Sequence, residues 1–177
     1  MRDGAGRCAS SFELADGPDS SAALHRAGIA ILPQEVVPLN SLIAIYIAWI
    51  VAQTGLSAPD HPPIHFVTPA EMGMRHGSPE NSGLELQALY NRNEGSIYLP
   101  QEWRPNDLRQ KSALLHELVH HVQRFNKIEL PCLGALERQA YDLQIKWLRE
   151  QGVDDPYDLI KTNELSIYLV STCRDGS

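Results

Sequence analysis

The sequence has 177 residues, of which 43% are hydrophobic and 21% are charged, and this is the composition of a globular protein rather than of a collagenous, coiled-coil or wholly disordered chain. Fifteen Lys and Arg against 22 Asp and Glu give a net charge of −7, so a nucleic acid is not an expected partner. The most apolar run, Leu42–Ala52, has 11 residues, whereas a membrane-spanning helix needs about 20, so no integral membrane segment is expected.

The N-terminal residues differ in composition from the rest of the chain. Residues 1–21 are rich in Gly, Ser, Asp and Ala and carry too little apolar surface to offset the entropy of folding, so we expect a disordered tail. The remaining residues, 22–177, have a suitable length for a single domain with its own core.

The first predicted helix spans about Pro38–Gln53. Asn40 or Ser41 is available as an N-terminal cap, and Gly55 supplies a stop. The side chains are apolar on nearly every side, which is typical of a central helix buried in the core.

Short β-prone runs follow this helix. Ile64–Thr68 is expected to be a strand, and Pro69 suits the first turn of a short helix with the sequence PAEMGM. Glu85–Tyr90 and Ser96–Leu99 are expected to form a hairpin, because the NRNEG segment between them contains Asn and Gly residues that accept positive φ angles.

Three more helices are expected in the second half of the chain. Apolar residues recur at helical spacing from Asp107 to about Asn126. A second helix is expected over about Gly134–Glu150 and a last one over about Pro156–Val170. The predicted fold class is therefore α+β, with a small antiparallel or mixed sheet and several helices.

The predicted helix from Asp107 contains the sequence HELVH, residues 116–120, which has the HExxH spacing. His116 and His120 lie one turn apart and about 40° around the helix, so both imidazoles can reach one metal ion. Glu117 lies about 100° from His116, where it can flank the ion and hold a water without binding the metal. Two histidines and a carboxylate are typical zinc ligands, so metal-activated hydrolysis is the expected chemistry.

A third protein ligand is needed to complete such a site. Glu137 is the best candidate, because it lies at the start of the next helix, and a turn around Pro131 can aim its carboxylate at the ion. Glu129 is the alternative, but it falls between the helices, where no rigid element directs it. His121 is about 100° from His120, and we expect it to lie at the surface or to support a ligand from behind.

Two polar residues share the predicted face of Glu137. Tyr141 and Gln144 lie within about 40° of it around the helix, and Ala140 leaves space beside them. The Tyr141 hydroxyl is a candidate catalytic group that could donate to an oxyanion or orient a ligand. A core tyrosine with a satisfied hydroxyl is an equally good interpretation.

These segments resemble the gluzincin group of zinc metallopeptidases, in its minimal single-domain form. The similarity rests on HELVHH in a helix, on a following helix that opens with ERQAY, and on the preceding strand GSIYLP, and it covers about residues 95–150. It implies a zincin-like fold, in which the sheet packs on an active-site helix that is followed by a glutamate helix and a C-terminal helix.

The resemblance also implies roles for individual residues. His116, His120 and Glu137 would bind Zn²⁺, Glu117 would act as the general base, and the substrate would be a peptide or protein. The strand Ser96–Leu99 would be the edge strand that pairs with the main chain of the substrate.

Three functions fit these observations. The first is a zinc metallopeptidase with Glu117 as its base. The second is a metal hydrolase of another amide or ester, which shares the site but lacks the peptide groove. The third is a zinc-stabilised binding or regulatory domain without peptidase activity.

The three cysteines leave the cellular compartment open. Helices 134–150 and 156–170 are expected to pack as an antiparallel pair, which would bring Cys173 to the level of Cys132 at a Cα separation of about 5.5 Å, suitable for a disulfide. Such a bond would favour the periplasm or the exterior and would leave Cys8 unpaired. Free thiols in a cytoplasmic protein are the alternative, since residues 1–20 contain no apolar stretch typical of a signal peptide.

Overall fold

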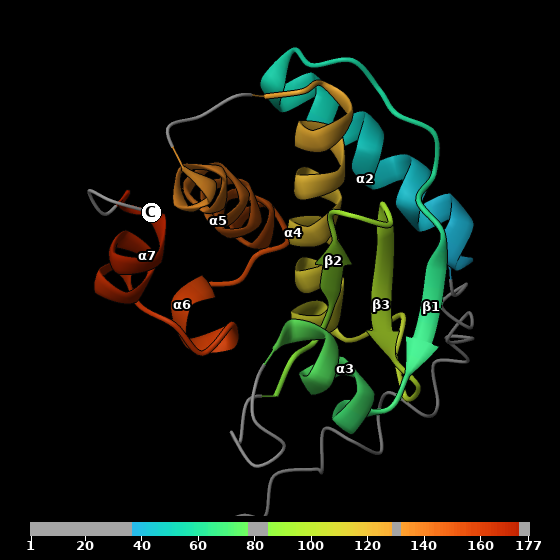
Figure 1. Ribbon diagram of the computed structural model, residues 1–177. Coiled ribbons are helices and arrows are strands. Elements are labelled where there is room, and N and C mark those ends of the chain that lie inside the picture. The colour runs from blue at the N-terminus through green and yellow to red at the C-terminus, as the bar shows by residue number, and fades with distance from the viewer. Residues whose placement is uncertain (1–36, 78–84, 129–131, 174–177) are drawn as a thin grey trace, which may run out of the picture. The chain divides into compact units, whose positions relative to one another are not determined.

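The computed structural model describes residues 37–77, 85–128 and 132–173, all of which belong to one compact unit, Val36–Ser177 (Figure 1). The predicted tail, residues 1–21, lies outside the described residues. In the part of the chain that the structure describes, six helices and a three-stranded mixed sheet form an α+β fold, as the sequence predicts. In chain order the elements are α2 (Leu39–Thr54), β1 (Ile64–Val67), α3 (Pro69–His76), β2 (Leu89–Asn91), β3 (Ser96–Pro100), α4 (Leu108–Phe125), α5 (Leu133–Glu150), α6 (Pro156–Leu159) and α7 (Glu164–Ser171).

The sheet has the strand order β1-β3-β2, with β1 parallel and β2 antiparallel to β3. The predicted hairpin is confirmed: the Asn91 side-chain oxygen accepts hydrogen bonds from the backbone N–H groups of Asn93 and Glu94, and Gly95 takes a positive φ of 73°. The expectation that Ser96–Leu99 is an edge strand is wrong. β3 is the central strand, because β1 pairs with its other side, and β2 is the edge strand nearest α4.

Both faces of β3 are covered. Ile97 and Leu99 point into the main core formed with α2, α4 and α5, whereas Tyr98 points to the opposite face and packs with Val67 and Met72 of β1 and α3. This alternation follows from the two-residue period of a strand.

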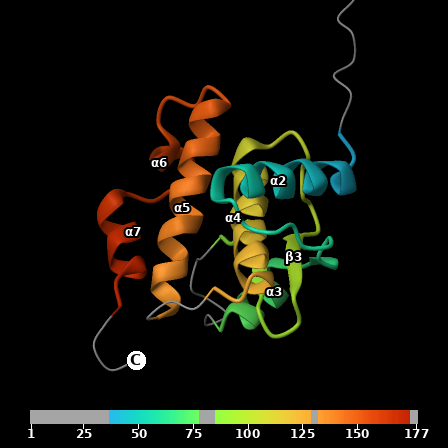
Figure 2. The same cartoon turned by 90° about the horizontal axis from the view of Figure 1, so that it is seen from above.

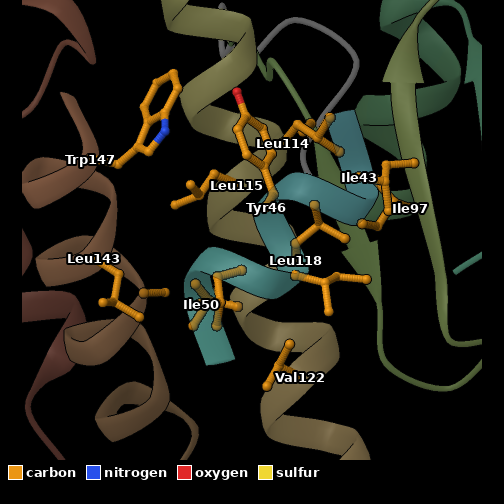
Figure 3. Close-up of a cluster of buried hydrophobic side chains, with 14 of the residues drawn as sticks. Ile43, Tyr46, Ile50, Ile97, Leu114, Leu115, Leu118, Val122, Leu143 and Trp147 are labelled. Carbon is orange, nitrogen blue, oxygen red and sulfur yellow. The ribbon is translucent and has the colours of Figure 1, made fainter. Parts of the chain in front are cut away.

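Helix α2 packs across α4 with one face only (Figures 2 and 3). Tyr46 and Ile50 lie in the core, but Ile45 is 55% exposed, so the expectation of a helix buried on all sides is wrong. The predicted caps Asn40 and Ser41 are also wrong. The helix begins after Pro38 without a side-chain cap, while the predicted stop at Gly55 is confirmed by its left-handed conformation.

Helix α4 lies between the sheet and α5, as Figure 1 shows. The predicted final helix over Pro156–Val170 is instead two short helices, α6 and α7. The chain leaves the helical conformation at Lys161, where φ is +56°, and Asn163 then caps α7 by accepting from the Ser166 backbone N–H at 2.8 Å. A new cap inside the segment therefore starts a second helix in a new direction.

The end of α7 folds back against the start of α5. Cys132 and Cys173 form a disulfide with a Cα separation of 5.6 Å, so the predicted pairing is confirmed although the predicted helix is broken. The contact is close, since a Cβ placed on Gly134 would lie 2.7 Å from the backbone oxygen of Val170. Cys8 lies outside the described residues. None of the helices within the described ranges has the length and apolar character needed to cross a bilayer.

Candidate metal centre

The HExxH segment lies in the middle of α4, whose position along the chain agrees with the prediction from the sequence. Asp107 caps it by accepting from the Gln110 backbone N–H at 3.1 Å, and the helix continues for 18 residues. The histidines lie on a different face from the leucines of the core, as predicted, but this face is covered by α5. His116 and His120 are only 8% and 7% exposed.

Glu137, in the second turn of α5, joins the two histidines. His116 Nε2 and His120 Nε2 are 3.2 Å apart, and they lie 3.3 Å and 3.2 Å from the two carboxylate oxygens of Glu137. Among the described residues this is the group of His, Cys, Asp and Glu side chains that could hold a metal ion, with all ligand atoms within 4.8 Å of one another. The structure therefore brings together the three predicted ligands. Glu129, the alternative carboxylate, lies outside the described residues.

The orientation of the His116 ring follows from a chain of hydrogen bonds. The Ser112 hydroxyl donates to the Arg109 backbone oxygen at 2.8 Å and accepts from Gln144 Nε2 at 3.1 Å. The amide oxygen of Gln144 must then face His116, whose Nδ1 lies 3.1 Å away. Because an amide oxygen can only accept, Nδ1 carries the proton and Nε2 presents a lone pair to the cluster.

His120 is fixed in the same way by a glutamine of its own helix. Gln123 Nε2 donates to the Leu136 backbone oxygen at 3.1 Å and to Gln139 Oε1 at 2.9 Å, so its amide oxygen must face the other way. That oxygen lies 2.9 Å from His120 Nδ1 and accepts its proton. The Gln123 side chain, 1% exposed, thus connects one ligand to the helix that carries another.

When both histidines are neutral, the two Nε2 atoms and the Glu137 carboxylate are therefore three acceptors directed to one point. No proton then lies between them. Burial alone would raise the pKa of Glu137, but in the metal-free protein the hydrogen bonds that His116 and His120 donate when they carry a second proton, together with their positive charge, outweigh burial and hold that pKa far below its ordinary value. For His120, burial lowers the pKa, and the hydrogen bond with Glu137 and the charge of Glu117 raise it above 6.5 overall. Both directions show a site that favours positive charge at its centre, so the donor set fits a divalent cation.

Glu117 is adjacent to the cluster but is not part of it. Its Oε2 accepts a hydrogen bond of 2.9 Å from the Tyr90 backbone N–H, on the edge strand β2. One carboxylate oxygen is thus held by the sheet, while the residue lines the two hollows beside the cluster.

Tyr141 covers the cluster from α5. Its ring packs edge-on against the His116 ring with a centroid separation of 4.7 Å. Burial raises the pKa of Tyr141, and the negative charges of Glu137 and Glu117 raise it further, so the hydroxyl stays protonated at neutral pH. Tyr141 lines the same two hollows as Glu117, while Ala140 is fully buried in the main core.

His121 takes no part in the cluster. Its Nε2 lies 2.9 Å from the Asp60 backbone oxygen and donates to it, so Nδ1 is left to accept from the Tyr90 hydroxyl at 3.3 Å. Burial lowers the pKa of His121, which keeps the ring neutral. The residue holds β2 and the loop before β1 against α4.

Two hollows meet at the cluster and share His116, Glu117 and Tyr141. One, of about 410 Å³, runs over the N-terminal half of α4, and the other, of about 310 Å³, runs past His120 and Glu137. Leu86 and Ala88, from the segment that leads into β2, line both. Together they form a groove that passes over the cluster.

Sequence reasoning missed the roles of Gln123, Ser112 and the Tyr90 backbone. Gln123 lies three residues after His120, on the same face of the helix, so its spacing is a usable signal. No local signal predicts the contact between Tyr90 and Glu117, because it depends on where the edge strand lies against α4.

The fold and the cluster define an α+β domain in which two buried histidines and a partly buried glutamate meet between two helices. The chain belongs to the family described as domain of unknown function DUF6647, whose model matches residues 35–176 and therefore includes the whole cluster. Comparison with curated proteins and with solved structures gives no match to the chain.

Proposed function

We propose that the protein is a zinc-dependent hydrolase, and specifically a metallopeptidase of the gluzincin type with a zincin-like fold. The observation that carries the proposal is the convergence of His116, His120 and Glu137, with both Nε2 lone pairs directed to one point by Gln144 and Gln123. A site that served only to connect two helices would not need two histidines whose protons are held on the far side of each ring.

The three ligand residues would hold the metal. When bound, zinc supplies a Lewis acid that polarises a carbonyl oxygen and lowers the pKa of water to about 7. Two nitrogens and a carboxylate would leave zinc one protein ligand short of four, as catalytic zinc sites require.

Glu117 acts as the general base. The Tyr90 N–H holds one of its carboxylate oxygens, which fixes the side chain beside the cluster and leaves the other oxygen to take a proton from the attacking water. The same residue can then deliver that proton to the leaving amine.

Tyr141 stabilises the negative charge that develops on the carbonyl oxygen. Its hydroxyl is protonated at neutral pH and belongs to a ring held against His116, so it is a donor in a fixed place. The substrate lies along Leu86 and Ala88, which line both hollows.

We also infer that the protein works in an oxidising compartment such as the periplasm or the exterior. The Cys132–Cys173 disulfide supports this inference, since such bonds persist in oxidising environments and are rare in the cytosol.

The decisive experiment compares Glu117→Gln with the wild-type protein. Glu117→Gln keeps the shape of the side chain and removes the proton acceptor, so cleavage of a mixed peptide library should fall by about 10² to 10⁴ while one zinc per chain is retained. His116→Ala serves as the control that loses both zinc and activity.

Two results would contradict the proposal. Unchanged turnover in Glu117→Gln would refute the proposed role of Glu117 as general base. Full zinc content in His116→Ala would refute the assignment of His116 as a zinc ligand. If the zinc-loaded protein hydrolyses esters or other amides but no peptide, the function is that of a different metal hydrolase.

A further inference from the structure

The larger hollow extends beyond anything that the proposed hydrolysis uses. Its lining includes two cationic side chains, Arg109 and Lys161, besides His116, Glu117 and Tyr141. Neither residue contacts the cluster, so their presence in the lining calls for another explanation.

Arg109 lies on the same stripe of α4 as the metal ligands. It precedes His116 by seven residues, which places it about 10 Å along the helix axis and within about 20° of the same direction. An extended peptide advances about 3.3 Å per residue, so a peptide in the groove would reach Arg109 about three residues from the bond at the cluster.

Lys161 lines the same hollow from another element. It lies in the turn between α6 and α7, where its positive φ of 56° marks the point at which the helix ends. α4 and the C-terminal turn thus each contribute one cation to a single hollow.

The present partners of both cations are exposed and replaceable. Arg109 pairs with Glu85 at 2.9 Å, and the Glu85 side chain is 77% exposed. Lys161 pairs with Asp158 at 3.3 Å, and the Asp158 side chain is 79% exposed. Ion pairs between exposed groups contribute little to stability, so an incoming carboxylate can take the place of Glu85 and form the two parallel hydrogen bonds that a guanidinium offers.

Two carboxylates, those of Glu85 and Glu117, line the same hollow as the two cations. Glu85 is the exposed partner of Arg109 that an incoming carboxylate would replace, and Glu117 lies beside the cluster, so Arg109 and Lys161 are the groups left to bind an anion. We propose that the substrate is an acidic peptide, with a carboxylate about three residues from the cleaved bond that binds Arg109 and Lys161. This inference rests on the proposed function for the position of the cleaved bond.

Binding to the zinc-loaded Glu117→Gln protein tests the inference without requiring cleavage. Fluorescently labelled peptides would carry Glu or Gln at each of three positions on either side of a central bond, with a free or an amidated C-terminus. We expect Glu at one position to bind at least 10-fold more tightly than Gln. An effect of the free C-terminus alone would identify a terminal carboxylate as the group recognised.

Variants then assign the preference to the residues. Adding Arg109→Gln to Glu117→Gln should abolish the difference between Glu and Gln peptides, and Arg109→Lys should keep part of it, because the charge remains but the paired hydrogen bonds are lost. Arg138→Gln is the matched control. Arg138 also pairs with a nearby carboxylate, Asp142, but it lies outside the hollow.

Equal binding of all peptides, or a preference that survives Arg109→Gln with zinc content intact, would overturn the inference. The proposed function is judged separately, by cleavage in the wild-type protein. If neutral and acidic peptides are cleaved equally well, the protein is a peptidase without this specificity. If acidic peptides bind tightly through Arg109 but are not cleaved, the acidic ligand stands and the peptidase function is refuted.

Discussion

Two glutamines decide which nitrogen of each histidine faces the cluster. The amide nitrogens of Gln144 and Gln123 donate to other acceptors, which turns each amide oxygen toward the Nδ1–H group of a histidine. Residues of this kind typically change metal affinity by about 10- to 100-fold when removed, although they never touch the metal.

Gln144→Ala should therefore lower zinc affinity by about 10- to 100-fold, while Gln144→Glu should retain most of it. The carboxylate of Gln144→Glu still accepts the His116 Nδ1 proton, and the Ser112 hydroxyl can rotate to donate to it. Competition with a chromophoric chelator measures both affinities. Wild-type affinity in Gln144→Ala would show that the ring orientation does not depend on this contact.

The spacing within HELVH was sufficient to predict that two histidines share one point, because the geometry of a single helix fixes it. The choice of Glu137 also followed from its place at the start of a rigid helix. The supporting contacts could not be predicted as fully. Gln144 was recognised only as sharing a face with Glu137, and its partner Ser112 lies 32 residues earlier on another helix.

At the scale of the helices, the disulfide links the start of α5 to Cys173, two residues after the end of α7. Removing it in the double variant Cys132→Ser/Cys173→Ser should lower the free energy of unfolding by about 4 kcal/mol in the chain-entropy model. Urea unfolding of the metal-free protein measures the loss. Since Glu137 lies five residues after Cys132, zinc affinity is expected to fall as well.

A thiol titration of the unfolded, unreduced protein checks the bond directly. One reactive thiol per chain, from Cys8, is expected, because Cys132 and Cys173 are joined. Three reactive thiols would refute both the disulfide and the inferred oxidising compartment.

Helices were predicted more accurately than the sheet, for a physical reason. Caps and helical periodicity are local, so α3, α4 and α5 were found with ends within a residue or two. Strand order depends on the pairing of β1 with β3 across about 30 residues of chain, which no local pattern records. The nearly continuous apolar run SIYLP was a signal that β3 is buried on both faces, as central strands are.

The prediction of one final helix was wrong because a local signal, the cap at Asn163, was overlooked. Apolar side chains continue through Pro156–Val170, and this continuity suggested a single helix. The cap at Asn163 and the left-handed Lys161 interrupt it, because a side-chain oxygen that satisfies the first N–H groups of a new helix competes with continuing the old one.

At the scale of the whole molecule, the site couples stability to pH. In the metal-free protein the depressed pKa of Glu137 contributes stability above its ordinary value of about 4.5, and this is lost as pH falls through the folded-state pKa. The raised pKa of His120 contributes stability below about 6.5, and this is lost as pH rises through the folded-state pKa. The cluster therefore stabilises the metal-free fold most between about pH 4.5 and 6.5.

Bound zinc should oppose the loss of stability that the metal-free protein shows as pH rises above about 6.5. Metal binding requires deprotonated histidines, so the stabilisation by a fixed concentration of free zinc grows with pH. We expect the difference in Tm between zinc-loaded and metal-free protein to widen from about pH 6 to pH 8. Thermal unfolding at several pH values measures it, and Glu137→Gln should show neither dependence. A constant difference in the wild-type protein would contradict the coupling.

The Cys132–Cys173 bond has one more consequence, for proteolytic processing. The residues it joins lie on either side of the loop between α5 and α6, where Gln151, Gly152, Asp154 and Asp155 are exposed. A protease that nicks this loop, or the protein acting on a neighbouring copy, produces two fragments that remain covalently attached. The nicked chain would migrate as a single band until it is reduced, and α5 with its glutamate would stay anchored to the C-terminal helix.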